Sequence, residues 1–524
     1  MSQKKLLGKL YARHIIWLIT LSFLMGTLFL VVYYKVHPIF LSAPLVMLFL
    51  VTIDSFQSKH SVRRNYPLVG RLRYLFESVR PEFRQYFFEG ELDGKPFNRR
   101  QRSIVYQRAK NQKQTISFGM QDEPNRIGYE WAAHSIYPKK NDFSQFRVTI
   151  GNSQCSKPYS ASIFNISAMS YGALSKTAIS SLNEGAKMGN FAHNTGEGGI
   201  SDYHLKGGDL IWQIGTGYFG CRDGKGHFND ALFVEKANLK EVKMIEIKLS
   251  QGAKPGHGGL LPAEKNTPEI ARIRALEPHT TVHSPSAHTA FSNATELLYF
   301  IQKLRNLSNG KPVGFKICIG KKEEFTEILE AMLMTNILPD FITIDGAEGG
   351  TGAAPLEFID YMGMALSDAL VFAHKSLLDY GLRNEIKILA SGKIISAFDI
   401  AKNMSLGADA CYSARGMMFA LGCIQALQCD SGKCPVGIAT QDKSLYKGLD
   451  ITDKRVRVAN FHKNTLKAVA EFIGACGFES PDQITPDTFF RRVNYNTNLN
   501  FKDIYFTNPE TKNKTLDKET IFLN

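Results

Sequence analysis

The stretch that decides the fold is residues 163–188, IFNISAMSYGALSKTAISSLNEGAKM. Its apolar start, 163–168, predicts a strand, and the spacing of apolar residues over 176–188 predicts a helix. The same order of strand, loop and helix returns as far as about residue 445. We therefore predict an α/β fold with a parallel sheet, most simply a (β/α)8 TIM-type barrel over residues 155–445; a doubly wound sheet is the alternative.

The rest of this region supplies the other elements of such a barrel. Further strands are predicted at 191–194, 210–214, 244–249, 280–283, 313–318, 341–344, 386–390 and 410–413. Further helices are predicted at 294–307, 323–334 and 366–378. Nearly every predicted strand ends in a loop rich in Gly, Ser or charged residues. A TIM-type barrel builds its site from the loops after its strands, so these loops are where we expect a ligand.

Three of these loops suit a planar ring and a charged substrate. Residues 167–172, SAMSYG, include small residues that let a ring approach the backbone closely. Residues 194–199, NTGEGG, place a carboxylate, Glu197, on a Gly-rich turn. Residues 248–256, KLSQGAKPG, offer two lysines and an amide on a flexible backbone.

Three later loops are typical of phosphate sites: 345–353 (DGAEGGTGA), 390–393 (ASGK) and 413–416 (SARG). Successive backbone N–H groups in such turns bind anions, and a helix start adds its dipole. A single Gly-rich loop is more often a simple turn, but a series of them at successive strand ends favours a binding site. Lys316 lies within an apolar strand, where a buried cation needs a partner, and a flavin ring would supply one.

Cys423, Cys429 and Cys434 are spaced C-x5-C-x4-C, and Pro435 follows the last of them. Three thiolates on a short, turn-rich loop suit a [3Fe–4S] cluster, because cysteine thiolates bind iron–sulfur clusters. The alternative is three reduced structural cysteines. Eight cysteines in 524 residues do not make a disulfide scaffold, and their clustering is typical of a reducing compartment.

Residues 1–58 predict a transmembrane hairpin. Residues 15–34 are an uncharged run long enough to cross a bilayer as a helix, and 38–53 are a shorter run that contains Pro44. A secretory signal peptide is the alternative for the first run. Lys and Arg gather before the first run and after the second, so the positive-inside rule places the catalytic domain in the cytoplasm, at the inner (cytoplasmic) membrane.

The net charge of +14 is concentrated in residues 1–110, which hold 18 Lys and Arg against 6 Asp and Glu. Beside a hairpin, this charge favours contact with membrane lipid. No nucleic-acid-binding motif accompanies it, so nucleic acid is not expected as a partner. Residues 59–154 are predicted to be a basic juxtamembrane adaptor without chemistry of its own, in which Pro81 breaks or kinks a helix. Residues 446–524 are predicted to be a helical extension, with a helix at 456–473 and a polar, partly loose tail beyond about 482.

The loop motifs resemble the FMN-binding synthase domain of glutamate synthases. The stretches that carry the resemblance are 167–172, 194–199, 251–256 (QGAKPG), 349–353 (GGTGA) and 434–441 (CPVGIATQ). They occur in the same order as in that domain and span about residues 160–445. The layout with an N-terminal hairpin resembles the stand-alone, membrane-anchored proteins of this family.

The resemblance implies that ammonia and 2-oxoglutarate condense to 2-iminoglutarate, which reduced FMN converts to L-glutamate by hydride transfer. It also implies that the [3Fe–4S] cluster relays electrons to FMN from a donor such as ferredoxin, a pyridine-nucleotide reductase or a quinol. The residues implied around the substrate are Glu197, Lys248, Gln251, Lys254 and Arg274. Those implied to hold FMN are Met169, Ser170, Lys316, Gly349, Gly350, Thr351, Ser391, Gly392, Arg415 and Gly416.

The sequence also departs from the large glutamate synthases. Nothing in it resembles their glutaminase domain, so ammonia is expected to arrive free or from a separate glutaminase partner. The loops at 256–263 and 284–288 differ from the pattern of the large synthases beside the substrate. The alternative function is therefore a membrane-linked FMN oxidoreductase that acts on another 2-oxo or 2-amino acid and exchanges electrons with quinone. A flavin-bearing electron carrier without enzymatic activity is a third possibility.

Overall fold

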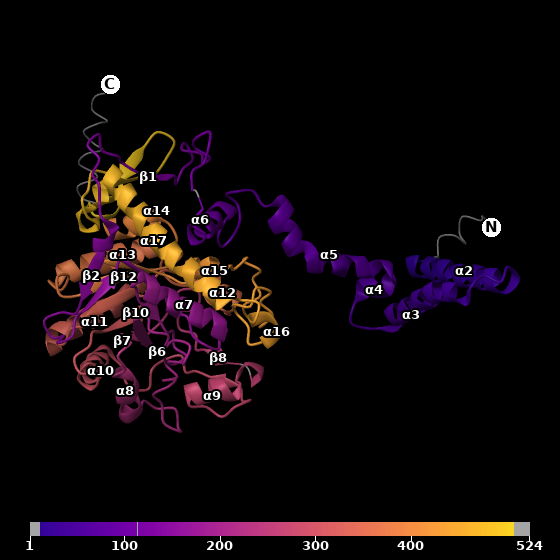
Figure 1. Ribbon diagram of the computed structural model, residues 1–524, viewed down its shortest axis with the longest axis horizontal. Coiled ribbons are helices and arrows are strands. Elements are labelled where there is room, and N and C mark those ends of the chain that lie inside the picture. Colours follow the sequence, from indigo (N-terminus) through magenta and orange to yellow (C-terminus); the bar gives the residue numbers. More distant parts are fainter. Residues whose placement is uncertain (1–10, 113, 262, 508–524) are drawn as a thin grey trace. The chain divides into compact units, whose positions relative to one another are not determined.

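The computed structural model describes residues 11–112, 114–261 and 263–507. The chain divides into two compact units, Met1–Gly94 and Lys95–Asn524 (Figure 1). The predicted segment 59–154 is thus divided between the two units, and the segment 446–524 belongs to the same unit as the barrel.

A closed barrel of eight parallel strands forms the centre of the second unit. Its strands follow one another around the barrel in sequence order, and the last closes it by pairing with the first. They are β4 (Phe164–Ile166), β5 (His193–Asn194), β6 (Leu210–Ile214), β7 (Val242–Lys248), β10 (Val313–Ile317), β11 (Phe341–Asp345), β12 (Lys387–Ser391) and β13 (Ala410–Ser413). The predicted TIM-type barrel is confirmed, and the doubly wound sheet is excluded.

Helices lie outside the strands, as the alternating pattern requires (Figure 1). They include α7 (Lys176–Gly189), α8 (Asp230–Ala237), α10 (Ala294–Leu307), α11 (Lys322–Thr335), α13 (Leu366–Asp379) and α14 (Ala397–Ser405). In α7, α8, α10 and α14 the residue before the helix is Ser or Asn, whose side chain accepts a hydrogen bond from a backbone N–H three residues later. Such caps fix where each helix starts, and therefore how long each preceding loop is.

One predicted strand, 280–283, is wrong as a barrel strand. Val282–His283 (β9) instead pairs antiparallel with Leu260–Leu261 (β8) outside the barrel. Strands of a parallel barrel are buried on both faces and therefore nearly all apolar, whereas Thr281 and His283 are exposed.

The amino end of the barrel is closed by an antiparallel hairpin of β2 (Arg147–Ile150) and β3 (Tyr159–Ser162). Ile150 packs in one buried cluster with Met244 and Phe341 from the barrel strands. The loops that follow the strands lie at the opposite, carboxyl end, and the pair of β8 and β9 belongs to the connection after β7.

The segments that flank the barrel pack against it. The long helix α17 (Ile451–Ala475) contacts α7 and α6 (Arg99–Ala109). After it, β14 (Phe489–Arg492) pairs with both β1 (Glu130–Ala132) and β15 (Asn498–Asn500). Phe489 and Phe501 are fully buried there, so the expectation of a loose tail beyond residue 482 is wrong for this stretch.

The first unit begins with two helical stretches, α2 (Ala12–Tyr33) and Pro38–Phe56, which comprises η1 (Pro38–Leu41) and α3 (Ser42–Phe56). By length and composition both are able to cross a membrane, and only 11% and 17% of their most apolar windows are buried, so they are not core helices of this unit. They form a hairpin in which Trp17 Nε1 donates to Ser55 Oγ at 3.0 Å.

Three short elements follow the hairpin: α4 (Ser61–Asn65), α5 (Val69–Phe83) and a π-helical segment, η2 (Arg84–Phe88). Pro81 does not end α5, because the helix continues through it and changes to π-helix at Arg84. The predicted break at Pro81 is therefore wrong, and the change of helix type is the local adjustment.

Candidate functional site

The carboxyl ends of β5, β6 and β7 bring together one carboxylate and three cations. Glu197 follows β5, and its Oε1 accepts a hydrogen bond of 2.8 Å from Nζ of Lys248, the last residue of β7. Gly215 follows β6, where a Cβ would clash with the Glu197 carboxylate. The positive charges of Lys254 and Arg274 also act on this carboxylate. Four of the five residues predicted around a substrate therefore converge.

Burial and ion pairing set the electrostatics of this cluster. Burial raises the pKa of Glu197, but the ion pair with Lys248 and the charges of Lys254 and Arg274 lower it to about 2. Burial and the charge of Lys248 lower the pKa of Lys254, and burial lowers the pKa of Arg274 to about 10. Three basic side chains thus surround one carboxylate, which leaves a local excess of positive charge.

Arg274 ends α9 (Pro268–Arg274) and is fixed by the loop after β4. Its Nη2 donates to the backbone oxygen of Tyr171 at 3.0 Å. The hydroxyls of Tyr171 and Tyr203 both donate to the carboxylate of Glu269, on the same helix, at 2.6 Å. Nε of Arg274 is buried and has no hydrogen-bond partner among the described residues. Buried polar groups are normally paired, so this N–H is available to a ligand.

A second pair of basic residues lies at the ends of β12 and β13. Arg415 is the first residue of α15 (Arg415–Leu421), and a Cβ on Gly350 would lie 2.7 Å from its Nε. Arg415 and Lys393 lie 4.8 and 5.5 Å from the ring centroid of Phe97. Burial lowers the pKa of Arg415 to about 10 and also lowers that of Lys393. Within the part of the chain that the structure describes, neither cation has a carboxylate within ion-pair distance, so the pair fits a phosphate.

Gly346 joins the glycine-rich turns around this pair. Its N–H donates to the backbone oxygen of Ser391 at 2.8 Å, and its own oxygen accepts from the N–H of Gly349 at 2.8 Å. A Cβ on Gly392 would lie 3.3 Å from the nitrogen of Gly346. Gly416 is equally restricted, because a Cβ there would clash with the Ser413 hydroxyl. The turns are thus closely packed, which favours glycine at these positions.

The loop after β4 lies between the two groups of cations. A Cβ on Gly196, next to Glu197, would lie 2.9 Å from the nitrogen of Ser170 and 3.2 Å from that of Met169. On the other side, Ser167 Oγ is 3.4 Å from Ser391 Oγ. Met169 and Ser170 therefore lie beside the carboxylate cluster, and Ser167 of the same loop lies beside the glycine-rich turns.

Lys316, on β10, has a carboxylate partner. Its Nζ lies 3.2 Å from Asp345 Oδ2, and the same oxygen accepts a hydrogen bond of 2.9 Å from the N–H of Gly252. Burial lowers the pKa of Lys316, but the charges of Asp345 and Glu246 raise it above its usual value. The adjacent strand therefore already supplies an acidic partner for this buried cation, and its contact with a flavin ring stays a prediction.

Glu246, on β7, is a site-supporting residue that the sequence analysis missed. It is fully buried in the barrel, where its carboxylate accepts hydrogen bonds of 2.7, 2.7 and 2.6 Å from Asn194, Gln213 and Thr343. These bonds tie β5, β6, β7 and β11 together two residues before Lys248. An acidic residue in the apolar run VKMIEIK was the available signal, since a buried charge is rare without a structural or functional reason.

The cysteine loop follows α15 directly. Burial, together with the proximity of Cys429 and Cys434, raises the pKa of Cys423 to about 12. The three thiols therefore lie near one another. Among residues 11–112, 114–261 and 263–507, no group of three or more His, Cys, Asp or Glu side chains is arranged to hold a single metal ion.

Residues before the barrel hold this loop, although the sequence analysis found no chemistry in them. The Tyr106 hydroxyl donates to the backbone oxygen of Cys423 at 2.6 Å. Gln425 Oε1 accepts from the N–H of Phe97 at 3.2 Å, and its Nε2 donates to the oxygen of Phe97 at 3.0 Å. Phe97 also lies against Arg415 and Lys393, so it contacts both the cysteine loop and the second pair of basic residues. Its partners are almost 300 residues away in sequence or more, which is why pattern reasoning missed it.

Two of the predicted residues take no part in these contacts. The side chain of Gln251 forms no hydrogen bond with the described residues, although its loop carries Lys254. Thr351 is half-buried, and the bond from its hydroxyl goes to the oxygen of Ala353 at 3.4 Å.

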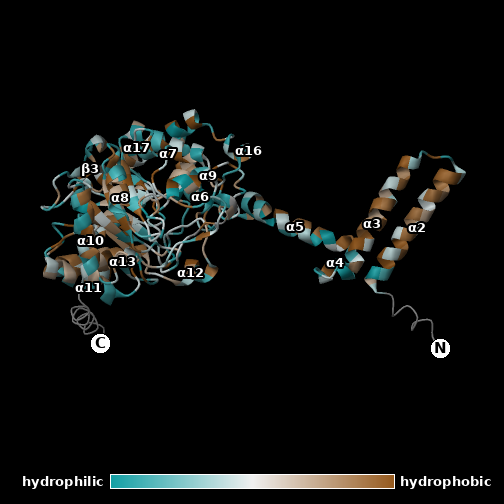
Figure 2. Cartoon of the chain, turned by 90° about the horizontal axis from the view of Figure 1, so that it is seen from below, coloured by the Kyte–Doolittle hydropathy of each residue, from teal (hydrophilic) through white to brown (hydrophobic). Residues whose placement is uncertain are grey.

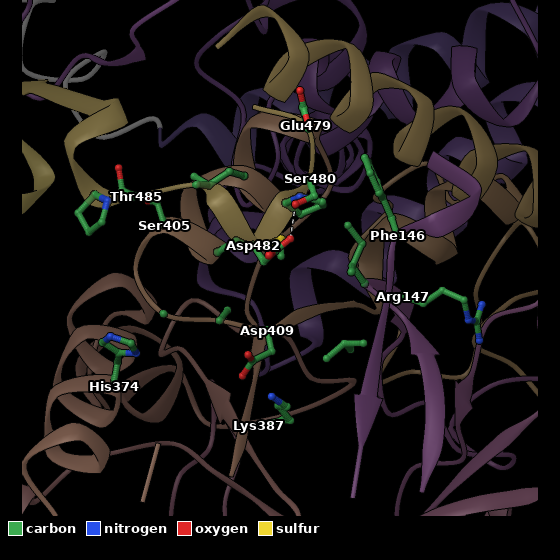
Figure 3. Close-up of a pocket in the computed structure, with 18 of the residues that line it drawn as sticks. Phe146, Arg147, His374, Lys387, Ser405, Asp409, Glu479, Ser480, Asp482 and Thr485 are labelled. Atoms are coloured by element: carbon green, nitrogen blue, oxygen red, sulfur yellow. Dashed lines mark hydrogen bonds between the residues drawn. The ribbon is translucent and has the colours of Figure 1, made fainter. Parts of the chain in front are cut away.

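A cavity of about 830 Å³ lies at the other end of the barrel (Figure 3). Its lining includes Lys387, the first residue of β12, and Asp409, just before β13. None of the predicted site residues lines it. Two of its charges are paired with each other: Arg383 Nη2 lies 2.9 Å from the Asp409 carboxylate.

Comparison with known proteins finds relatives that match most of the second unit. The conserved region of glutamate synthases matches residues 105–479. The chain is 37% identical to the glutamate synthase large subunit-like protein YerD of Bacillus subtilis (strain 168), over 84% of this chain and 92% of that protein. It is 34% identical to the archaeal glutamate synthase [NADPH] of Methanocaldococcus jannaschii, over 69% of this chain and 67% of that protein.

A solved structure of the recombinant flavin-binding domain of baker's yeast flavocytochrome b2 is similar with a TM-score of 0.42 and 13% identity, over 84% of this chain and 90% of that chain. The match to the conserved region covers more than half of the 524 residues. The chain belongs to the glutamate synthase family of oxidoreductases.

Proposed function

We propose that this protein reductively aminates 2-oxoglutarate to L-glutamate, in a glutamate synthase-like reaction. The observation that carries the proposal is the grouping of Lys248, Lys254 and Arg274 around the single carboxylate of Glu197. The excess of two positive charges matches the two carboxylates of a 2-oxo dicarboxylate. Cation–carboxylate hydrogen bonds are about twice as strong as neutral ones, so this excess selects for such a substrate.

Within this proposal, Arg274 holds one substrate carboxylate. Its Nη2 is fixed by Tyr171, while its buried Nε–H is unpaired among the described residues. A guanidinium presents its N–H groups as a rigid fork, so a carboxylate docked on it is oriented as well as bound. Lys248 binds the other carboxylate, and the amide of Gln251 adds a donor from the same loop.

Glu197 and Lys254 differ in the proton chemistry that they support. A carboxylate with a pKa of about 2 is a weak base, so Glu197 attracts ammonium and positions Lys248 rather than removing a proton. The ammonium group of Lys254 has a lowered pKa, which makes it the better proton donor. We assign it to protonate the carbonyl oxygen that leaves as water when ammonia adds to the 2-oxo carbon.

FMN is the cofactor that these loops fit. Arg415, with its neighbour Lys393, would bind the phosphate beside the glycine-rich turns, and Lys316 would supply positive charge to the ring. When bound, FMN supplies the hydride that reduces the imine carbon. The residues proposed to hold it are Met169, Ser170, Lys316, Gly349, Gly350, Thr351, Ser391, Gly392, Arg415 and Gly416.

A [3Fe–4S] cluster is proposed on Cys423, Cys429 and Cys434. The proposal is supported by the donor set, because the charges of Cys429 and Cys434 act on the Cys423 thiol. In a cluster each thiolate binds its own iron, so the thiols need not converge on one point as they would for a single ion. The cluster would supply single electrons to the flavin.

The proposed surroundings of the reaction follow from the rest of the chain. The N-terminal hairpin is proposed to tether the barrel to the inner membrane, with the catalytic unit in the cytoplasm. Ammonia is taken up free or from a separate glutaminase partner. The electron donor is ferredoxin, a pyridine-nucleotide reductase or a quinol; the name of the Methanocaldococcus jannaschii relative includes NADPH.

The test is anaerobic flavin spectroscopy on the holoprotein. The bound flavin is reduced stoichiometrically and then mixed with 2-oxoglutarate and ammonium together, or with either alone. The proposal expects rapid reoxidation only with both, and one glutamate formed per flavin reoxidised. A flavin that stays reduced with this pair, but is reoxidised by another 2-oxo acid with ammonium or by quinone alone, would contradict the proposal and support the alternative oxidoreductase.

A further inference from the structure

An apolar stripe runs along α5 and into η2, and it is exposed within the first unit. Leu72, Phe76, Val79, Phe83 and Phe87 are spaced by three or four residues, which places them on one helix face. Four of them, all except Val79, have relative exposures between 50% and 74%. An isolated helix of this length is marginally stable in water and depends on burial of its apolar face, so this stripe needs a cover.

A buried carboxylate sets the direction in which α5 leaves the hairpin. Asp54, near the end of α3, is fully buried. It accepts hydrogen bonds from the guanidinium groups of Arg63 (2.6 and 2.9 Å) and Arg71 (2.7 and 2.9 Å) and from the N–H of Leu68 (3.1 Å). Since Arg63 lies on α4 and Arg71 on α5, one side chain fixes three helices. Figure 2 shows α5 running across the direction of α2 and α3.

The charges beside the stripe decide between the possible covers. Arg73, Arg80 and Arg84 lie on one flank of the helix and are exposed. Glu77 lies on the same flank, 3.9 Å from Arg73, so the flank keeps an excess of positive charge. Arginines beside an apolar stripe place their charged ends among phosphate headgroups while the stripe enters the acyl boundary. A second copy of the helix would bring these like charges together instead. The stripe also starts soon after the hairpin, at the point where a spanning helix would leave the bilayer.

We propose that α5 and η2 lie flat on an anionic lipid surface, with the stripe of Leu72, Phe76, Val79, Phe83 and Phe87 in the acyl boundary and Asp54 holding the required turn. The proposal rests on the membrane tether in the proposed function and is independent of the reaction. Lipid, rather than the catalytic unit or a second copy, is the occupant to which the arginines are complementary.

The test adds one tryptophan to either face of α5 in the full-length holoprotein. Trp131 and Trp212 remain in the catalytic unit, and their signal, measured in the Trp17→Phe protein, is subtracted. Phe76→Trp reports on the stripe and Ser78→Trp on the opposite face, both with Trp17→Phe, because Trp17 lies in the hairpin. The proteins are reconstituted into vesicles of phosphatidylglycerol and phosphatidylcholine with brominated acyl chains. We expect at least threefold more quenching for Phe76→Trp than for Ser78→Trp, and a smaller difference when phosphatidylglycerol is left out.

Two further proteins make each outcome decisive. The wild type, in which Trp17 is retained, reports whether the hairpin enters the bilayer. Quenching of Trp17 with equal, weak quenching at positions 76 and 78 would overturn the proposal alone, and would mean that protein or water covers the stripe. No quenching of Trp17 would overturn the membrane tether as well. Asp54→Asn in the Phe76→Trp protein is expected to reduce the quenching of the introduced tryptophan's fluorescence toward the level of Ser78→Trp, while the flavin spectrum stays unchanged. Quenching that is not reduced would mean that Asp54 does not hold the turn.

Discussion

Both ends of the barrel carry charged side chains, but the pairing of these charges differs between the ends. At the amino end, beside the cavity of about 830 Å³, Arg383 and Asp409 pair at 2.9 Å. At the carboxyl end, three cations share one carboxylate, Glu197, and Nε of Arg274 has no partner among the described residues. The comparison teaches that the balance of buried charge, rather than cavity volume, distinguishes the end that suits a dianionic substrate.

The largest expected effect contrasts cysteines at the two ends. Cys429 lies in the loop at the carboxyl end, and Cys155 lies in the hairpin that closes the amino end; both are half-buried. Cys429→Ser removes a proposed iron ligand, so we expect iron and acid-labile sulfide to fall to near zero. Cys155→Ser is the matched control and keeps both. Metal analysis of the purified proteins decides the point, and full iron in Cys429→Ser would remove the cluster from this loop.

The second prediction contrasts lysines at the ends of two strands. Lys248 is the last residue of β7 and Lys387 the first of β12. Losing a charged hydrogen bond costs about 1.5–3 kcal/mol, so Lys248→Met is expected to slow flavin reoxidation by 2-oxoglutarate and ammonium about 10- to 200-fold. Lys387→Met should react at the wild-type rate. Stopped-flow absorbance measures the reoxidation rates of both variants. Equal rates would mean that the two ends of the barrel do not differ in their effect on the reaction.

A smaller effect separates the two groups of cations at the carboxyl end, the one around Glu197 and the one beside the glycine-rich turns. Arg415→Met removes a buried cation that has no carboxylate partner among the described residues, so we expect FMN to bind about 10-fold more weakly, as the loss of one charge-assisted bond implies. The substrate affinity of the FMN-saturated variant should change little, because Arg415 lies with the glycine-rich turns and not with Glu197. Fluorescence titration of the apoprotein measures the first quantity. Unchanged FMN affinity would place the phosphate elsewhere.

The smallest effect is a change in pH dependence. With its pKa lowered to about 2, Glu197 is ionised throughout the range from pH 5 to 8. Without Lys248, the effect of burial, which raises this pKa, meets less opposition, so the carboxylate starts to protonate as the pH falls. The ratio of the Lys248→Met rate to the wild-type rate should therefore decrease a few-fold from pH 8 to pH 5. A ratio that is constant with pH would mean that Lys248 does not control this carboxylate.

Much of the fold was predictable because barrel strands and their loops have strong local signals. Apolar runs such as 341–344 end in glycine-rich turns, and eight of the nine predicted strands coincide with barrel strands. The ninth, 280–283, failed because a short run of two Thr and one Val looks the same in an exposed two-stranded sheet.

The site was less predictable wherever it depends on contacts that are distant in sequence. Lys316 was recognised as a buried cation, but its partner Asp345 is known only once β10 and β11 are paired. Phe97 and Tyr106 reach the cysteine loop across more than 300 residues. No local pattern reports such contacts, whereas the glycines and lysines of single loops could be found by their spacing.

The most direct measurement of the central claim is equilibrium binding of 2-oxoglutarate to the oxidised holoprotein, followed through the flavin absorbance. Wild type, Lys248→Met and Lys387→Met are titrated at the same ionic strength. We predict the same Kd for wild type and Lys387→Met, and a Kd about 10-fold higher or more for Lys248→Met, as the loss of a charged hydrogen bond implies. Binding that weakens in Lys387→Met and not in Lys248→Met would contradict the account and move the substrate to the cavity at the amino end.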